Sequence, residues 1–135
     1  MVEKIFPAKD TELDNVIGFI EENLEKAGCS LKTQMSIEVA IEEIFVNVAH
    51  YAYNGDDGDA KVSFEFNPGT RTATFIIADR GIPFNPLKKE DPDITLSADE
   101  REIGGLGIFI TKKTMDSIHY SYENNENILT MTKVI

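Results

Sequence analysis

The spacing of hydrophobic residues divides the first part of the chain into a strand and a helix. Residues 2–6 have the apolar, extended character of a short strand. A helix is predicted to follow, capped by Asp10 or Thr11, running to about Ala27 and stopped by Gly28. Its apolar residues recur at helical spacing and form one stripe: Leu13, Val16, Ile17, Ile20 and Leu24.

A second, longer helix is predicted from Ser30, its capping residue, to about Tyr51. Apolar residues occupy most of its circumference, so the helix is expected to be buried on most sides. Glu38 and Glu42 are expected to face solvent. The main apolar face carries Ile37, Ile41, Ile44, Phe45 and Val48.

The second half of the chain predicts two hairpins separated by a loop and a helix. Residues 61–67 and 71–78 alternate with period two around the turn at 67–70, which is typical of a hairpin. Residues 79–104 form a loop with three prolines, and a loop of that length in a small domain is usually functional. The remaining predicted elements are a helix at Gly107–Met115, strands near Ile118–Tyr122 and Ile128–Lys133, and a turn at Glu123–Asn127.

The order of these elements is strand, helix, helix, strand, strand, loop, helix, strand, strand. Because the strands are joined mostly as hairpins, this order predicts an α+β fold, a two-layer sandwich. Its sheet is expected to be mixed and mostly antiparallel, with three helices on one face. At 135 residues and 41% hydrophobic content, the chain is expected to form one domain over residues 1–135.

Charge narrows the classes of partner. The chain has 13 Lys and Arg against 24 Asp and Glu, a net charge of −11, which disfavours direct binding to nucleic acid or to anionic membrane. A phosphorylated ligand is therefore expected to be held by backbone N–H groups, a helix N-terminus and a divalent metal. The single Cys29 excludes a disulfide within the chain. With no apolar run of about 18 residues and no signal-peptide pattern, a cytoplasmic location is expected.

The first candidate for chemistry is Glu43 with Asn47 on the long helix. At positions i and i+4 the two side chains lie about 40° apart on one face, beside the main apolar stripe. A carboxylate and a carboxamide so placed can orient a hydroxyl and ligate a hard divalent ion through oxygen. An ordinary solvated helix face is the alternative interpretation.

The second candidate is Asp79, which directly follows the apolar strand TATFIIA. An aspartate at a buried strand end can accept a charge-assisted hydrogen bond from a ligand amine. Gly81 permits close approach of the backbone. A tight turn with a capping aspartate is the alternative.

The third candidate is the glycine-rich start of the last helix, Gly104-Gly105-Leu106-Gly107. Exposed backbone N–H groups and the helix dipole suit a phosphate there, whereas the alternative is a flexible hinge. The acidic segment NGDDGD at residues 54–59 is interpreted as a solvated turn, because it lacks the ligand order of a calcium loop.

Taken together in order, these motifs resemble one superfamily. IEVAIEEIFVNVAHYAY, FIIADRGIPFNPL and EIGGLGIFITKKTMDSIHY are similar to the three motifs of the GHKL (Bergerat-fold) ATP-binding superfamily. Within it, the chain resembles small bacterial anti-sigma factors that are also serine/threonine protein kinases. The resemblance covers essentially the whole chain and implies the Bergerat ATP-binding fold.

The resemblance implies a role for each matching residue. Glu43 would be the general base, and Asn47 would ligate Mg²⁺ between the phosphates of ATP. Asp79 would receive the adenine amino group, and Gly81 would pass close to the base.

The resemblance also implies how the phosphates are held. Gly105, Leu106 and Gly107 would lie beneath them at the helix start, and residues from about 86 to 103 would form a lid over ATP. Arg101, in the last turn of the lid, is a candidate contact for the γ-phosphate from its position alone.

Three departures from the family pattern stand out. Four residues after Asn47, where the family often has histidine, the chain has Tyr51, and the neighbouring His50 is given a structural role rather than a catalytic one. Asn85 stands where many relatives have aspartate. The last strand lacks the common Gly-Thr pair, which weakens one water-mediated contact to adenine, and Thr130 is a candidate substitute.

The function implied is an ATP-dependent regulatory switch. The chain would phosphorylate a serine or threonine on a small antagonist protein, sequester a sigma factor, and form a homodimer. Two alternatives remain: a nucleotide-gated protein-binding module without phosphotransfer, and the catalytic domain of a histidine kinase.

Overall fold

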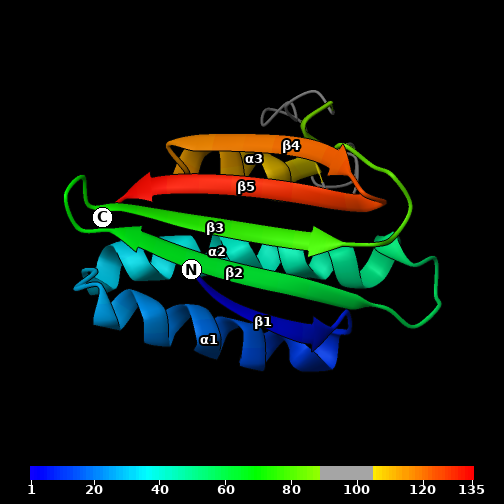
Figure 1. The fold of residues 1–135 in the computed structure, drawn as a ribbon, viewed down its shortest axis with the longest axis horizontal. Helices are drawn as coiled ribbons and strands as arrows, with labels where there is room; N and C mark the ends of the chain where they lie inside the picture. Colours follow the sequence, from blue (N-terminus) through cyan, green and yellow to red (C-terminus); the bar gives the residue numbers. More distant parts are fainter. Residues whose placement is uncertain (89–104) are drawn as a thin grey trace.

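The computed structural model describes residues 1–88 and 105–135, and it confirms the predicted α+β, two-layer architecture. Three helices cover one face of a five-stranded sheet (Figure 1). The main elements are β1 (Val2–Pro7), α1 (Leu13–Lys26), α2 (Leu31–Asn47), β2 (Asp59–Asn67), β3 (Thr72–Asp79), α3 (Gly105–Thr114), β4 (Ser117–Glu123) and β5 (Glu126–Val134). Three single turns complete them: 3₁₀ turns at Asp10–Glu12 and Pro86–Lys88 and a π-helix at Val48–Ala52.

The strands lie in the order β1-β2-β3-β5-β4. Every pairing in the described part of the chain is antiparallel, so the mostly antiparallel sheet was predicted correctly and no parallel pair is found there. The β3–β5 pairing places Asp79 directly opposite Asn127. Two residues 48 positions apart thereby meet at one end of the sheet.

The core lies between the sheet and the helices, with α2 in the middle of the helical layer (Figure 1). Phe45 of α2 and Phe75 of β3 are completely buried there. Each such side chain contributes about 1.5–3 kcal/mol by leaving water. The apolar faces predicted for the first two helices are thus the faces that hold the layers together.

The hairpin between β4 and β5 turns through two asparagines. Asn124 and Asn125 both have positive φ, of 53° and 63°, which gives the tight two-residue turn that suits the twist of a hairpin. The observed turn therefore spans two residues, whereas a five-residue turn at 123–127 was predicted. The strands gain those residues, and Asn127 becomes part of β5.

The caps of the first two helices differ from each other. Ser30 caps α2 as predicted, because its Oγ accepts a hydrogen bond from the Thr33 N–H at 3.3 Å. The predicted cap of the first helix by Asp10 or Thr11 was wrong: a 3₁₀ turn leads into α1, and no side chain caps either. Asp10 instead lies 2.6 Å from Nε2 of His50, a contact across 40 residues. That contact also gives His50 a structural partner.

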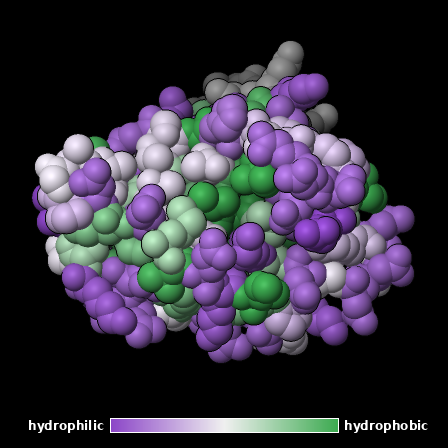
Figure 2. Space-filling view, in the orientation of Figure 1, coloured by the Kyte–Doolittle hydropathy of each residue, from purple (hydrophilic) through white to green (hydrophobic). Residues whose placement is uncertain are grey.

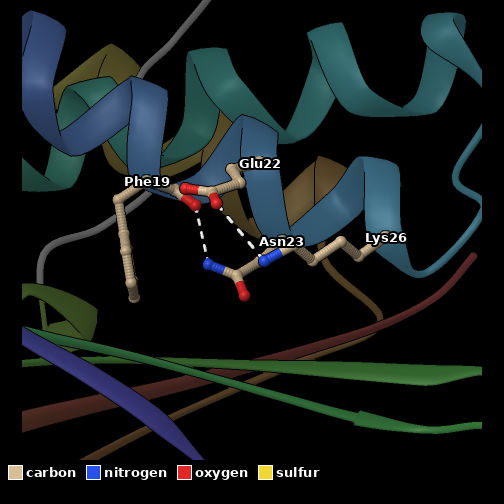
Figure 3. A network of polar contacts seen from close by, with 4 residues as sticks. All are labelled: Phe19, Glu22, Asn23 and Lys26. Atoms are coloured by element: carbon tan, nitrogen blue, oxygen red, sulfur yellow. Dashed lines mark hydrogen bonds and ion pairs between the residues drawn. The ribbon is translucent and has the colours of Figure 1, made fainter.

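The side of α1 that faces the sheet contains one buried polar residue. Asn23 donates from Nδ2 to the carbonyl oxygen of Phe19 at 2.8 Å, so this buried amide group is hydrogen-bonded (Figure 3). On the exposed side, Lys26 pairs with Glu22 one turn earlier at 3.3 Å (Figure 3). Both contacts lie within the helix.

The face of the sheet opposite the helices is open. Figure 2 shows apolar atoms near its centre, flanked by hydrophilic ones. Since side chains alternate along a strand, Leu129 and Met131 of β5 point under the helices, and Thr130 between them points to the open face. Among the described residues, no helix combines the length and the hydropathy needed to cross a membrane.

Glu38 does not face solvent as predicted, whereas Glu42 is exposed. Glu38 is half-buried, and its Oε1 accepts a hydrogen bond from Gln34 at 3.5 Å. Burial raises the pKa of the Glu38 carboxyl, and the nearby Glu21 and Glu25 raise it further. Sequence spacing placed Glu38 on the outer side of α2, but the adjacent α1 covers part of that side.

Glu38→Gln is expected to raise the melting temperature at pH 7 by about 1–2 °C, a few tenths of a kcal/mol. A carboxyl whose pKa is higher in the folded than in the unfolded protein destabilises the fold least below its unfolded pKa. Its contribution to stability becomes less favourable as the pH rises through the folded pKa. Glutamine cannot become charged, so the gain in melting temperature is expected at pH 7, where the carboxyl would be ionised, and not at pH 4. Thermal melts at both values check this, with Glu42→Gln as the exposed control. An equal gain at both pH values would contradict it.

Candidate nucleotide site

A cavity of about 420 Å³ opens between the end of α2, the end of β3, the start of β5, and the segment that leaves β3. Its walls are mostly apolar, with a few polar groups, which is typical of a site for a small organic ligand. The residues that line it are Ile44, Asn47, Val48, Tyr51, Ala52, Ile77, Asp79, Ile82, Pro83, Phe84, Pro86, Ile108, Tyr120, Asn127 and Leu129.

Of the first predicted pair, Asn47 lines this cavity, whereas Glu43 is not among the lining residues. Asn47 is the last residue of α2 and lines the cavity, and Glu43 lies one turn earlier and is half-buried. A Cβ on Gly107 would lie 3.1 Å from Cδ of Glu43 and would overlap its Oε2. The structure therefore brings Glu43 and Gly107 together, although 64 positions separate them.

From α3, Ile108 lines the cavity. The helix begins at Gly105, two residues earlier than predicted, and continues through Leu106 and Gly107. Thr111 donates to the carbonyl oxygen of Gly107 at 2.9 Å, and its Oγ1 lies 3.5 Å from that of Ala40 in α2. The first N–H groups of a helix have no partner within it, so this end can meet an anion.

Most of the predicted lid falls outside the described residues, and so does Arg101. Its beginning is described: Oδ1 of Asn85 accepts a hydrogen bond from the Leu87 N–H at 2.9 Å. This bond opens the short 3₁₀ turn at Pro86–Lys88. Asn85 therefore serves as a turn residue at the point where the lid was predicted to start.

Asp79, the last residue of β3, also lines the cavity and is 7% exposed. Its Oδ1 accepts two hydrogen bonds, from the Gly81 N–H at 2.9 Å and from Nδ2 of Asn127 at 3.0 Å. Among the residues that the structure describes, none donates a hydrogen bond to Oδ2. A buried carboxylate oxygen without a donor is a strong acceptor for a ligand N–H.

The segment after Asp79, residues 80–84, is held at both ends and forms the outer wall of the cavity. The Ile82 N–H donates to the carbonyl oxygen of Ala52 at 2.7 Å. Gly81 lies so close to the π-helix that a Cβ there would be 2.7 Å from the Cβ of Ala52 and would overlap its carbonyl oxygen. The glycine is thus required by contact with the π-helix as well as by any contact with a ligand.

Two tyrosines brace this wall. The hydroxyl of Tyr53 donates to the carbonyl oxygen of Asp59 at 2.5 Å and accepts from the Arg80 N–H at 2.9 Å. Burial raises the pKa of Tyr53 and of Tyr120, and the charge of Asp79 raises both further. Both hydroxyls therefore keep their protons at neutral pH and can donate.

Sequence reasoning missed Asn127 and Tyr120 and named Thr130 as a candidate substitute for one contact to adenine. Thr130 points to the open face of the sheet and does not line the cavity, so it cannot be the substitute contact to a base. Asn127 occupies the cavity side of β5 and bonds to Asp79. The strand register could have found it, because Asp79 and Asn127 are direct partners, but the register was not known from the sequence.

Asn47 is the residue suggested for a metal. In residues 1–88 and 105–135, no three His, Cys, Asp or Glu side chains form a group that could hold an ion by themselves. Asn47 offers one amide oxygen at the cavity wall.

Comparison with known proteins finds relatives across most of the chain. Residues 6–133 match the family described as the histidine kinase-like ATPase domain. A Bacillus licheniformis protein named serine-protein kinase RsbW is 26% identical over 116 residues, covering 82% of this chain and 70% of the relative. A Bordetella bronchiseptica protein named serine/threonine-protein kinase BtrW is 22% identical over 103 residues, covering 76% and 72%.

Solved structures share the fold. The RsbU and RsbW domains of a Mycobacterium tuberculosis protein superpose with a TM-score of 0.65 at 15% identity, over 98% of this chain and 32% of theirs. A histidine kinase domain from Erythrobacter litoralis gives a TM-score of 0.57 at 14% identity, over 90% and 60%. This chain therefore spans less than two thirds of either solved chain.

Proposed function

Because the chain belongs to the histidine kinase-like ATPase domain family, the GHKL family, we propose that it is an ATP-binding anti-sigma regulatory factor with serine/threonine protein kinase activity. The observation that carries this proposal is the arrangement of the cavity. A buried acceptor, Asp79, and the amide of Asn47 both line it, and Glu43 lies one turn before Asn47, against Gly107 near the start of α3. In this proposal residues 1–135 act as a single ATP-binding domain.

The cavity has the chemistry that an adenine nucleotide requires. Asp79 Oδ2, buried and without a donor among the described residues, suits the exocyclic amine of adenine. Apolar side chains such as Ile77 and Leu129 suit the faces of the ring. The start of α3 suits the phosphates, which is the solution open to a chain with a net charge of −11. Arg101 and the lid at 86–103 are proposed to complete the phosphate site.

Asn47 is proposed to hold Mg²⁺ through its amide oxygen, with phosphate oxygens and water as further ligands. Bound Mg²⁺ would neutralise negative charge on the phosphates. The i, i+4 spacing puts Glu43 beside Asn47 on α2, so the carboxylate lies next to the phosphate end of the cavity.

Glu43 is proposed to accept the proton of a serine or threonine hydroxyl on the partner. The hydroxyl oxygen bonds to the γ-phosphorus while the bond to the bridging oxygen breaks, which leaves ADP and a phosphorylated partner.

The proposed partners are a small antagonist protein, which carries the phosphorylated residue, and a sigma factor that the chain sequesters. Phosphorylation of the antagonist would favour the complex with the sigma factor. A homodimer is the proposed assembly. The names of two relatives, serine-protein kinase and serine/threonine-protein kinase, support a protein substrate that carries a serine or a threonine.

A second candidate function is a nucleotide-gated binding module without phosphotransfer. One observation favours it: Glu43 packs against Gly107, so a structural contact alone can account for this carboxylate. Transfer of labelled γ-phosphate to a serine-bearing partner distinguishes the two functions.

Asn47→Ala is expected to remove most of the stabilisation by ATP that depends on Mg²⁺. ATP at about 100 times its Kd stabilises a protein by about 2.7 kcal/mol, which raises the melting temperature by several degrees. Melting curves with ATP in Mg²⁺ and in EDTA measure this, with Asn15→Ala on the exposed side of α1 as the control. An undiminished shift in Asn47→Ala would exclude Asn47 as the metal ligand. No shift in the unmodified protein would count against the nucleotide site.

A further inference from the structure

Asn127 is the polar centre of the wall beside Asp79. It is 7% exposed, and its side-chain nitrogen donates to Asp79 Oδ1 and to the carbonyl oxygen of Ile82, both at 3.0 Å. Its oxygen accepts from the Phe84 N–H at 3.0 Å and from the Tyr120 hydroxyl at 2.5 Å. The side chain thus joins the end of β3, the segment 80–84 and β4.

These bonds fix the orientation of the Asp79 carboxylate. With Gly81 and Asn127 both donating to Oδ1, the carboxylate cannot rotate without breaking two hydrogen bonds. Oδ2 is then the oxygen that remains for a ligand. An acceptor held in one direction by buried partners discriminates more strongly between ligands with and without a hydrogen-bond donor than an acceptor that can turn.

The same side chain holds the outer wall at a fixed distance from the sheet. Ile82 and Phe84 both bond to it and both line the cavity. A buried amide is unfavourable unless its hydrogen bonds are made, and the amide of Asn127 makes them with this wall, with Asp79 and with the hydroxyl of Tyr120, which also lines the cavity. Its contacts therefore serve the cavity rather than the general core.

We propose that Asn127 is a positioning residue that presents Asp79 Oδ2 to the ligand and so makes the site select a 6-amino purine over a 6-oxo purine. The amino group donates to Oδ2, whereas a 6-oxo group would point lone pairs at a carboxylate that has no proton to give. A site built for one hydrogen bond rejects the analogue that leaves its buried group unpaired. This inference rests on the proposed nucleotide site.

The test compares the affinities of ADP and inosine diphosphate (IDP) in Mg²⁺ by titration calorimetry. The unmodified protein is expected to prefer ADP by about 10- to 100-fold, the range of one charge-assisted hydrogen bond. Asn127→Ala is expected to lower this preference to about threefold or less, mainly through weaker ADP binding. Thr130→Val, on the same strand but on the open face, is the control and is expected to keep the full preference.

Asn127→Leu guards against loss of folding in the alanine variant. Its branched side chain fills the space of the asparagine and leaves no cavity, but it can no longer donate to Asp79, so it is also expected to lose the preference. Without any ligand, the Phe84 amide proton is expected to exchange faster with solvent in Asn127→Ala than in Thr130→Val.

The outcomes separate this inference from the proposed function. If the unmodified protein binds neither nucleotide, the proposed nucleotide site fails and the inference fails with it. If the unmodified protein prefers ADP and both Asn127 variants keep that preference, the positioning role alone is overturned. A loss of preference in both variants, with Thr130→Val unchanged, supports it.

Discussion

Glu43→Gln is expected to lower the rate of phosphate transfer to a serine-bearing partner by about 10²- to 10⁴-fold, the contribution of a general base. Glutamine has nearly the same shape, so the contact with Gly107 is retained, but its amide cannot accept the proton of the attacking hydroxyl. ATP affinity is expected to stay within about threefold of the unmodified protein, because the binding groups at Asn47 and Asp79 are unchanged.

The measurement uses ATP labelled at the γ-phosphate, a candidate antagonist protein, and the rate of label transfer. Glu42→Gln is the matched control, since Glu42 is adjacent in sequence, exposed and outside the cavity. Transfer at an unchanged rate in Glu43→Gln would exclude this carboxylate as the base. If the unmodified protein binds ATP and its partner yet transfers no label, the gated binding module becomes the better description.

Gly81→Ala is expected to lower the melting temperature by about 10 °C and to abolish nucleotide binding. The new methyl group would overlap the carbonyl oxygen of Ala52, and neither backbone can move without breaking the bond from Ile82 to that oxygen. Overpacking costs about 1–3 kcal/mol and the lost hydrogen bond about 1 kcal/mol more, which gives the expected shift. The outer wall of the cavity would be displaced at the same time.

Gly18→Ala is the matched control, because Gly18 lies inside α1 with nothing within 4 Å of an added methyl group. It is expected to stabilise the protein by about 0.5–1 kcal/mol, as alanine does in a helix interior. Circular dichroism melts of both variants, with and without ADP, make the comparison. A Gly81→Ala variant that melts and binds as the unmodified protein does would show that the wall can yield at Ala52.

Local features of the sequence were sufficient for the secondary structure. The helical stripe of α1, the cap at Ser30 and the period-two strands β2 and β3 depend on residues a few positions apart, and each was predicted close to its observed bounds. The resemblance to the GHKL family was carried by three short motifs of the same local kind. Comparison then confirmed the family over residues 6–133.

Three of the wrong predictions concern a residue whose surroundings are set by another element or by a strand's orientation in the sheet. Asp10 does not cap a helix, and its carboxylate instead contacts the imidazole of His50, 40 positions away. Glu38 is half-buried because α1 covers one side of α2. Thr130 was selected for the base site, although the pleat of β5 turns it to the opposite face.

Periodicity and short motifs were enough to predict the elements, the family and the residue types of the candidate site. The way in which the site is assembled depends on the fold. The antiparallel register placed Asn127 opposite Asp79, and packing of α3 on α2 placed Gly107 against Glu43. Strand register and helix packing are fixed by the fit of whole faces against one another. No short stretch of sequence therefore specifies them.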